Sequence, residues 1–182
     1  MTIFIFLAEG FEETEAVATI DILRRGGLEV ISVSITNGSI VIGAHDIAVI
    51  ADQVFDKTDF SHGDMLVLPG GMPGTKNLNA HAGLRDLLLR YNNEGKRIAA
   101  ICAAPSILGE LELLAGKQAT VYPGYESSLT EATVVDLPVI KDGNIITAQS
   151  PGAVFDFGLA IITELFGQEK ADEVAAGMVW KK

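Results

Sequence analysis

The chain has 182 residues, of which 48% are hydrophobic and 20% are charged, and its formal net charge at pH 7 is −11. This length and composition suit one domain with a substantial core, while the negative charge argues against nucleic acid and anionic membrane surfaces as partners. No apolar stretch approaches the roughly 20 residues of a membrane span, no secretory leader is visible, and a single cysteine fits a reducing, cytoplasmic compartment.

The first 60 residues predict a strand, a helix, a second strand and a hairpin. Residues 11–25 have acidic side chains in the first turn of the expected helix and arginines in the last, and Gly26 and Gly27 follow, as the helix dipole and glycine termination favour. The apolar runs on either side predict parallel strands that this helix joins. The predicted strands are residues 2–8, 28–35, 40–42 and 46–51, and residues 52–60 are expected to be irregular.

The remainder of the chain continues the alternation of apolar strands and helices. Strands are predicted at residues 65–68, 98–101, 119–122, 133–135, 139–141 and 144–148, and helices at residues 84–91, 103–114, 153–166 and 169–179. We therefore expect an α/β protein: a single domain, residues 1–182, built as a three-layer α/β/α sandwich around a mainly parallel sheet. In such sheets the functional site lies at the carboxyl ends of the strands.

One short stretch combines a buried strand, a sharp turn and the start of a helix around the only cysteine, Cys102. Residues 98–101 form an apolar run too short for a helix, and Pro105 suits a first helical turn. Ala100 and Ala104 flank the cysteine at the two-residue offsets where a nucleophile elbow needs small side chains. The sulfur would then lie at a helix start, where N–H groups favour a thiolate. The same spacing is compatible with an inert cysteine in the core.

Two further loops are expected to end beside this turn. Gly70 and Gly71 follow the strand at 65–68, and the N–H group of one or the other, with that of Ala103, would bind an oxyanion. An ordinary strand-to-helix turn is the alternative. Glu15, in the first helix, would face the thiolate. Because two negative charges repel in a dry site, its carboxyl group is expected to be partly protonated and to serve as general acid and base. The alternative is a solvated carboxylate that stabilises the helix dipole.

The sequence contains no pattern that indicates a cofactor or a metal ion. No G-x-G-x-x-G motif follows the first strand and no phosphate-loop lysine is present, so a nucleotide site is not predicted. The one cysteine and three histidines lack the spacing of metal ligands. We therefore expect neither a cofactor nor a metal.

Four segments in this order and spacing resemble the ThiJ/PfpI family, within the DJ superfamily, and the resemblance covers nearly the whole chain. They are residues 8–16 (AEGFEETEA), 67–71 (VLPGG), 99–105 (AAICAAP) and 150–157 (SPGAVFDF). The resemblance implies a flavodoxin-like domain, related to class I glutamine amidotransferases, that assembles as a homodimer. By the same resemblance, Cys102 matches a reactive, easily oxidised cysteine, and Glu15 matches the carboxyl group that hydrogen-bonds it. The residues that match the anion pocket are Gly70, Gly71 and Ala103. Arg25 matches a basic residue near the site.

The chain departs from the family pattern at three positions. Relatives often carry a histidine before the proline that follows the cysteine helix, where this chain has Tyr122. The protease-named branch has a histidine directly after the cysteine, where Ala103 stands here, so peptidase activity is not expected. His45 falls where relatives have an arginine that reaches the partner's site. We consider that His45 supplies a basic group in trans, or that it is an ordinary loop histidine.

Two functions remain open at this point. In the first, Cys102 adds to a small reactive carbonyl such as methylglyoxal, in glutathione-independent glyoxalase or deglycase-like chemistry. In the second, the protein is a non-enzymatic redox sensor or chaperone whose Cys102 is oxidised by peroxide to a sulfinate. The tyrosine at position 122 removes a Cys–His pair and favours the second function somewhat.

Overall fold

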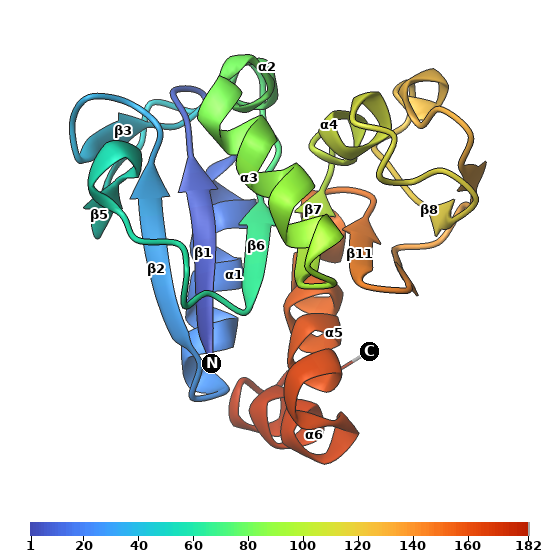
Figure 1. The fold of residues 1–182 in the computed structure, drawn as a ribbon. Coiled ribbons are helices and arrows are strands. Elements are labelled where there is room, and N and C mark those ends of the chain that lie inside the picture. Colours follow the sequence, from blue (N-terminus) through green and yellow to red (C-terminus); the bar gives the residue numbers. More distant parts are fainter. Residues whose placement is uncertain (182) are drawn as a thin grey trace.

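The computed structural model describes residues 1–181 and has a seven-stranded sheet at its centre (Figure 1). From one edge to the other the strands are β10 (Val139–Asp142), β11 (Ile145–Ala148), β7 (Arg97–Ile101), β6 (Met65–Leu68), β1 (Thr2–Leu7), β2 (Glu29–Ser34) and β5 (Gln53–Val54). The pairing of β10 with β11 is antiparallel and the other pairings in this sheet are parallel. The predicted mainly parallel α/β sheet is therefore confirmed.

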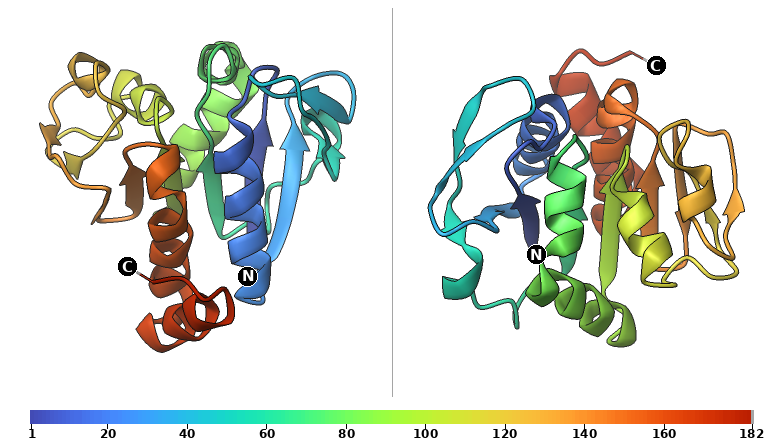
Figure 2. Two further views of the ribbon diagram at one scale, coloured as in Figure 1. Left: turned by 180° about the vertical axis from the view of Figure 1, so that it is seen from behind. Right: turned by 90° about the horizontal axis from the view of Figure 1, so that it is seen from above.

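Helices cover both faces of the sheet. One face packs against α1 (Glu13–Arg25), α5 (Val154–Phe166) and α6 (Gln168–Gly177), and the other against α2 (Gly74–Ala80), α3 (Ala82–Asn93) and α4 (Pro105–Glu110) (Figures 1 and 2). The two cores follow from the alternation of side chains along a strand. In β1, Phe4 and Phe6 point into the core under α3 and α4, whereas Ile3 and Ile5 point into the core under α1 and α5. This confirms the three-layer sandwich.

The strand order also matches the flavodoxin-like topology. Taken in chain order, the five long-range parallel strands are β1, β2, β6, β7 and β11, and their spatial order is 2-1-3-4-5. In this topology the carboxyl ends of β1, β6 and β7 meet where the strand order reverses. The loops after these three strands are therefore brought together at one edge.

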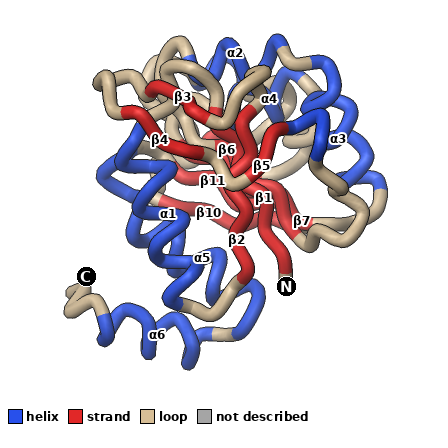
Figure 3. Tube along the Cα trace, turned by 90° about the vertical axis from the view of Figure 1, so that its left-hand side faces the viewer, coloured by secondary structure: helices blue, strands red, loops and turns tan. Residues whose placement is uncertain are grey.

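Outside the central sheet lie two small ladders and three 3₁₀ turns. A hairpin of β3 (Ile40–Ile42) and β4 (Ala48–Ile50) forms as predicted, near α1 (Figure 3). Its Val41 is buried against Phe11 and Ala16. The second ladder joins β8 (Gln118–Ala119) to β9 (Thr133–Val134), and the 3₁₀ turns span Phe55–Lys57, Glu126–Ser128 and Pro151–Ala153.

Several element boundaries differ from the sequence-based expectation. Helix α4 is shorter than the predicted 103–114, and Glu112, just beyond it, adopts a left-handed φ of 59° that a helix does not contain. The predicted strand 119–122 is reduced to β8, because the N–H of Tyr122 donates to the carbonyl of Cys102 instead of a neighbouring strand. Helix α2 was not predicted, since it has little apolar periodicity and Leu78 is its one large buried side chain.

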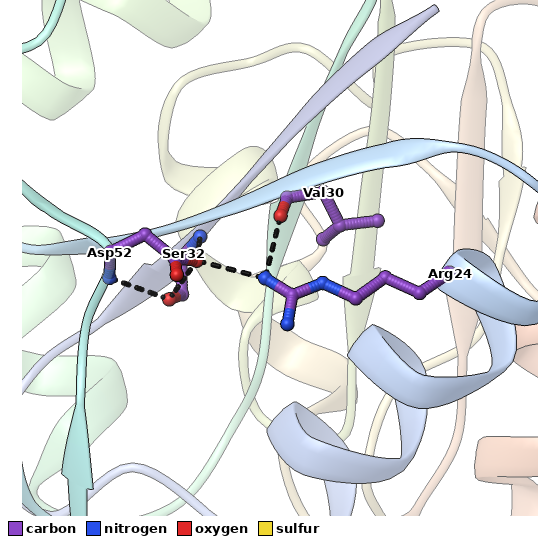
Figure 4. A network of polar contacts seen from close by, with 4 residues as sticks. All are labelled: Arg24, Val30, Ser32 and Asp52. Carbon is purple, nitrogen blue, oxygen red and sulfur yellow. Dashed lines mark hydrogen bonds and ion pairs between the residues drawn. The ribbon is translucent and has the colours of Figure 1, made fainter.

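A polar network fastens the end of α1 to the edge of the sheet (Figure 4). The Asp52 carboxylate accepts from the N–H of Ser32 at 2.8 Å, its hydroxyl at 2.7 Å and the Arg24 guanidinium at 2.9 Å. Arg24 also donates to the carbonyl of Val30 at 2.8 Å. Burial alone would raise the pKa of Asp52, but the hydrogen bonds from Ser32 and the charge of Arg24 hold it below its ordinary value. The network anchors the loop that leads into the two-residue strand β5.

Within residues 1–181, no helix combines the length and the apolar character that crossing a membrane requires.

Candidate active site

Cys102 occupies a sharp turn directly after β7. Its backbone is left-handed, with φ of 63°, which costs about 1–2 kcal/mol for a residue with a Cβ. Two hydrogen bonds hold this conformation: its N–H donates to the carbonyl of Ala148 at 2.9 Å, and its carbonyl accepts from the N–H of Tyr122 at 2.8 Å. Ala100 and Ala104 are fully buried on either side. The strand–turn–helix geometry of an elbow is therefore present, with the cysteine 8% exposed.

Glu15 projects from the first turn of α1 into the same edge and is completely buried. Its Oε2 accepts from the N–H of Gly70 at 2.7 Å, whereas its Oε1 is buried without a nitrogen or oxygen partner. The polar group that faces Glu15 is the thiol of Cys102, and the hydrogen bond between them affects the pKa of both. Glu12 fixes the start of the helix, since its carboxylate accepts from the N–H of Glu15 at 2.6 Å.

The glycines after β6 are required by close approach. A Cβ on Gly70 would lie 2.8 Å from the Cβ of Cys102 and 2.9 Å from Oε2 of Glu15. Gly71 has φ of 93°, and a Cβ there would lie 2.3 Å from the N atom of Glu12. The N–H groups of Ala103 and Gly71 hydrogen-bond the Cys102 thiol and favour its ionised form. The turn thus presents two backbone donors and one carboxyl group to the sulfur.

The Glu15–Cys102 pair holds its protons unusually tightly. Burial raises the pKa of Glu15 to about 7, although the hydrogen bonds from Gly70 and Cys102 oppose this rise. Burial, followed by the charge and hydrogen bond of Glu15, raises the pKa of Cys102 to about 12, against the opposing Ala103 and Gly71 donors. As a coupled pair, the two groups release their first proton near neutral pH and the second only in strong alkali.

This result differs from the expectation that the helix start makes Cys102 a free thiolate. Helix α4 begins only at Pro105 and has six residues, so its dipole is short. The cysteine is buried and faces a carboxylate, and both effects disfavour a second negative charge. At neutral pH the Cys102 thiol therefore keeps its proton, and the Glu15 carboxyl group is about half protonated.

Arg25 and Tyr122 differ in how close they lie to Cys102 and Glu15. Arg25 is the last residue of α1, about 15 Å along the helix from Glu15, and pairs with Asp21 at 2.6 Å. Within the chain, the helix axis carries Arg25 to the opposite edge of the sheet from Cys102, and its predicted place near a site stays a prediction. Tyr122 contacts Cys102 through its backbone, while its side chain is 43% exposed.

His45, in the turn between β3 and β4, pairs with Glu13 of the same chain. Its N–H donates to Oε1 of Glu13 at 2.6 Å, and its Nδ1 lies 2.8 Å from Oε2. The sequence did not predict this pair, since its partners are 32 positions apart and leave no local signal. The hydrogen bond and charge of Glu13 raise the pKa of His45.

Among residues 1–181, one group of side chains has the spacing of a metal site. Ligand atoms of Glu12, Glu13 and His45 all lie within 4.8 Å of one another. These groups already have protein partners, since Glu12 caps α1 and Glu13 holds the hairpin through His45. The arrangement is explained by these structural contacts.

Comparison with known proteins places the chain among proteins of one family. A family model described as the DJ-1/PfpI family matches residues 1–164. The chain is 41% identical over 178 residues to protein DJ-1 homolog A of Arabidopsis thaliana, 37% over 177 residues to protein dj-1beta of Drosophila melanogaster and 34% over 158 residues to a deglycase of Pyrococcus abyssi. These matches cover 96%, 96% and 85% of this chain, and 45%, 95% and 93% of the relatives. The chain thus spans less than half the length of the Arabidopsis protein.

Solved structures of DJ-1 proteins also superpose closely on this chain. A DJ-1 superfamily protein of Salmonella typhimurium, 33% identical, superposes with a TM-score of 0.95 over 100% of this chain and 99% of its own. Drosophila DJ-1beta, 36% identical, has a TM-score of 0.95 over 100% of this chain and 98% of its own. Toxoplasma gondii DJ-1, solved in an oxidized form, is 32% identical with a TM-score of 0.95 over 100% of this chain and 99% of its own.

Proposed function

The chain belongs to the DJ-1/PfpI family, and on that basis we propose that it acts on small reactive carbonyl compounds as a glutathione-independent glyoxalase or deglycase-like enzyme. A relative from Pyrococcus abyssi is named a deglycase. The observation that carries the proposal is the buried pair of Cys102 and Glu15, in which the carboxyl group has a pKa of about 7. A base with a pKa near the working pH is best suited to proton transfer.

In the proposed reaction, the sulfur of Cys102 bonds to the aldehyde carbon of a 2-oxoaldehyde such as methylglyoxal. The carbonyl electron pair moves to oxygen, where the N–H groups of Gly71 and Ala103 stabilise it, and the thiol proton passes to the Glu15 carboxylate. No free thiolate has to accumulate, which is compatible with the raised pKa of Cys102.

The remaining steps involve no external oxidant. Glu15 first returns the thiol proton to the alkoxide oxygen, which gives the neutral hemithioacetal and restores the carboxylate. Glu15 then transfers a proton from the former aldehyde carbon to the neighbouring carbonyl carbon, and the hydroxyl proton moves to the neighbouring oxygen. The hemithioacetal thereby becomes a thioester. Water then cleaves the carbon–sulfur bond, releasing a 2-hydroxy acid and regenerating the thiol. Glu15 would act in both proton transfers.

The first test is the pH dependence of Cys102 alkylation by iodoacetamide in the wild type and in Glu15→Gln. We expect the wild-type rate to rise with a midpoint near 7, because ionisation of the pair supplies the base. The Glu15→Gln variant should lose this midpoint and react only as a buried thiol does. The same midpoint in both proteins would contradict the proposed role of Glu15.

The second candidate function is a redox sensor. Here the Cys102 sulfur attacks a peroxide oxygen, the O–O bond breaks with loss of water, and a second peroxide converts the sulfenic acid to a sulfinate. It is supported by the two backbone donors at the sulfur, by Tyr122 in place of a histidine, and by the oxidized form of the Toxoplasma relative. Turnover of methylglyoxal that disappears in Cys102→Ser supports the enzyme; a mass gain of two oxygens at Cys102 without turnover supports the sensor.

We also propose that the chain forms a homodimer through the β3–β4 hairpin. Four isoleucines on this hairpin are exposed, namely Ile40, Ile42, Ile47 and Ile50, and such concentrated apolar exposure is typical of contact surfaces. Light scattering on Ile50→Asp tests this: we expect a monomer, whereas Leu89→Asp, at an exposed leucine of α3, should leave the assembly unchanged. A wild-type protein that is already monomeric would contradict the proposal.

A further inference from the structure

A cavity of about 550 Å³ lies between α5, α6 and β10, and Cys102 is not part of its lining. Its wall includes Glu164, which contacts Arg97 at the first residue of β7, whereas Cys102 follows the last residue of that strand. The two places are therefore separated by the length of β7, about 16 Å. In Figure 1, α6 crosses the lower end of α5, opposite the sheet edge that carries the cysteine. This volume is within the range of small-molecule sites.

The charged residues of the cavity lining are predominantly acidic. Three carboxylates line the cavity, from Asp156, Glu164 and Asp172, together with a single ammonium group, that of Lys141. Lys141 forms an ion pair with Glu164, which also binds Arg97 at 2.8 Å. The one ammonium group that the described residues bring to the lining is thus already paired with a carboxylate.

Asp172 is the carboxylate best placed for a ligand. Its Oδ1 accepts from the Gln168 amide at 2.8 Å, and it makes no ion pair with any residue in the described part of the chain. The neighbouring Glu173 pairs with Lys170 instead and does not line the cavity. A carboxylate held by a neutral amide retains its full charge and offers a second oxygen to a cation.

The lining also contains apolar side chains and one aromatic ring, that of Trp180. Trp180 is held by a hydrogen bond from its N–H to the carbonyl of Ala175 at 2.9 Å. Its indole stacks on the ring of Phe155 with centroids 4.6 Å apart and an angle of 10° between the planes. Trp180 lines the cavity and Phe155 does not, so the part of the indole that borders the cavity lies away from Phe155. An indole ring offers a large apolar surface to the hydrocarbon part of a ligand.

We propose that this cavity binds an organic ammonium compound, with its charged end at Asp172 and its apolar body against Trp180 and Leu159. A lining that combines carboxylates with apolar and aromatic side chains matches a ligand that is cationic at one end and hydrocarbon at the other. Cys102 does not line this cavity.

The test uses the emission of Trp180, which is the only tryptophan of the chain. The full-length protein is titrated at pH 7 with hexylamine, and in parallel with 1-hexanol and hexanoate as neutral and anionic probes of the same length. We expect a saturable change with hexylamine, with binding about tenfold tighter than for 1-hexanol, as one charge-assisted hydrogen bond provides. Calorimetry with the same probes checks that the optical change reports binding.

Matched variants distinguish a built site from general attraction to an acidic protein. Asp172→Asn should weaken hexylamine binding about tenfold, whereas Glu173→Gln, which removes the adjacent charge outside the cavity, should leave it unchanged. Cys102→Ser should bind as the wild type does, which keeps this result separate from the proposed enzyme function. Absence of saturable binding, equal binding of 1-hexanol, or equal losses in the two acidic variants would overturn the proposal.

Discussion

Two glutamates in the first turn of α1 are both buried, yet their acidities move in opposite directions. Glu15 accepts a single backbone N–H, from Gly70, and faces a thiol; burial raises its pKa to about 7. Burial would also raise the pKa of Glu13, but hydrogen bonds from the side chain and backbone of His45 lower it below the ordinary value. The two carboxylates differ in both depth and donors: burial dominates at Glu15, which is fully buried with one N–H donor, whereas hydrogen bonds outweigh burial at Glu13, which is 6% exposed and held by His45.

The largest expected difference between the two glutamates is in catalysis. Glu15→Gln should lower kcat/KM for methylglyoxal about a thousandfold, within the range by which positioned acid–base groups accelerate reactions. Glu13→Gln should remain within a few-fold of the wild type, because the Glu13 carboxylate binds the hairpin. Steady-state lactate formation measures both variants. Similar losses in the two would remove the distinction between them.

The next largest effect is on the free energy of unfolding, whose pH dependence is opposite for Glu15 and Glu13. The folded-state pKa of Glu15, about 7, lies above the ordinary 4.5, so its stabilising contribution is fully present below pH 4.5 and is lost as the pH rises through 7. Relative to Glu15→Gln, the wild type should lose about 3 kcal/mol of unfolding free energy between pH 4.5 and 8. Urea unfolding at intervals of one pH unit measures this.

The Glu13→Gln variant is the control for the direction in which stability changes with pH. Its folded-state pKa is lowered, so its contribution is present above pH 4.5 and is lost as the pH falls through the lowered pKa. The difference between the wild type and Glu13→Gln should therefore shrink in acid, where the Glu15 difference is constant. Parallel pH profiles of the two variants would show that burial alone governs both carboxylates.

A smaller loss of stability and turnover is expected when a methyl group is added beside Glu15 and Cys102. Gly70→Ala places a methyl group 2.8 Å from the Cβ of Cys102 and 2.9 Å from Oε2 of Glu15, which should cost about 2 kcal/mol of stability and reduce turnover. Gly38→Ala, where no atom lies within 4 Å of the added Cβ, is the matched control. Thermal unfolding and methylglyoxal turnover are measured on both. Equal stability of the two variants would show that the site is looser than its contacts indicate.

The smallest change in stability is expected when His45, the partner of Glu13, is replaced. His45 is exposed and its pKa is raised by Glu13, so its contribution is present below its ordinary pKa and is lost as the pH rises through the raised value. His45→Ala should therefore destabilise the protein slightly below pH 6.5 and less at pH 8, as urea unfolding would show. The same variant tests action in trans: an unchanged midpoint of Cys102 alkylation and unchanged turnover would exclude that role.

Most of the framework was predictable from local patterns. The apolar runs at β1, β6 and β7 predict buried parallel strands, and the strand–turn–helix rule then places Gly70, Gly71 and Cys102 at one edge. The sequence predicted these elements because hydrophobic periodicity and turn residues are local properties. The residues that converge on the elbow were found because each follows a strand directly or, like Glu15, opens the next helix.

The sequence by itself therefore determined the α/β sandwich and the elbow at Cys102, since both depend on the order of short local signals. Only the tertiary structure decided the charge states: that Glu13 is buried beside His45, that Glu15 holds its proton near neutral pH, and that Cys102 is a thiol with a raised pKa. It also decided that Arg25 lies at the far end of α1 and that Asp172 and Trp180 share a cavity. These properties depend on desolvation and on donors from distant segments, and no stretch of sequence contains both partners.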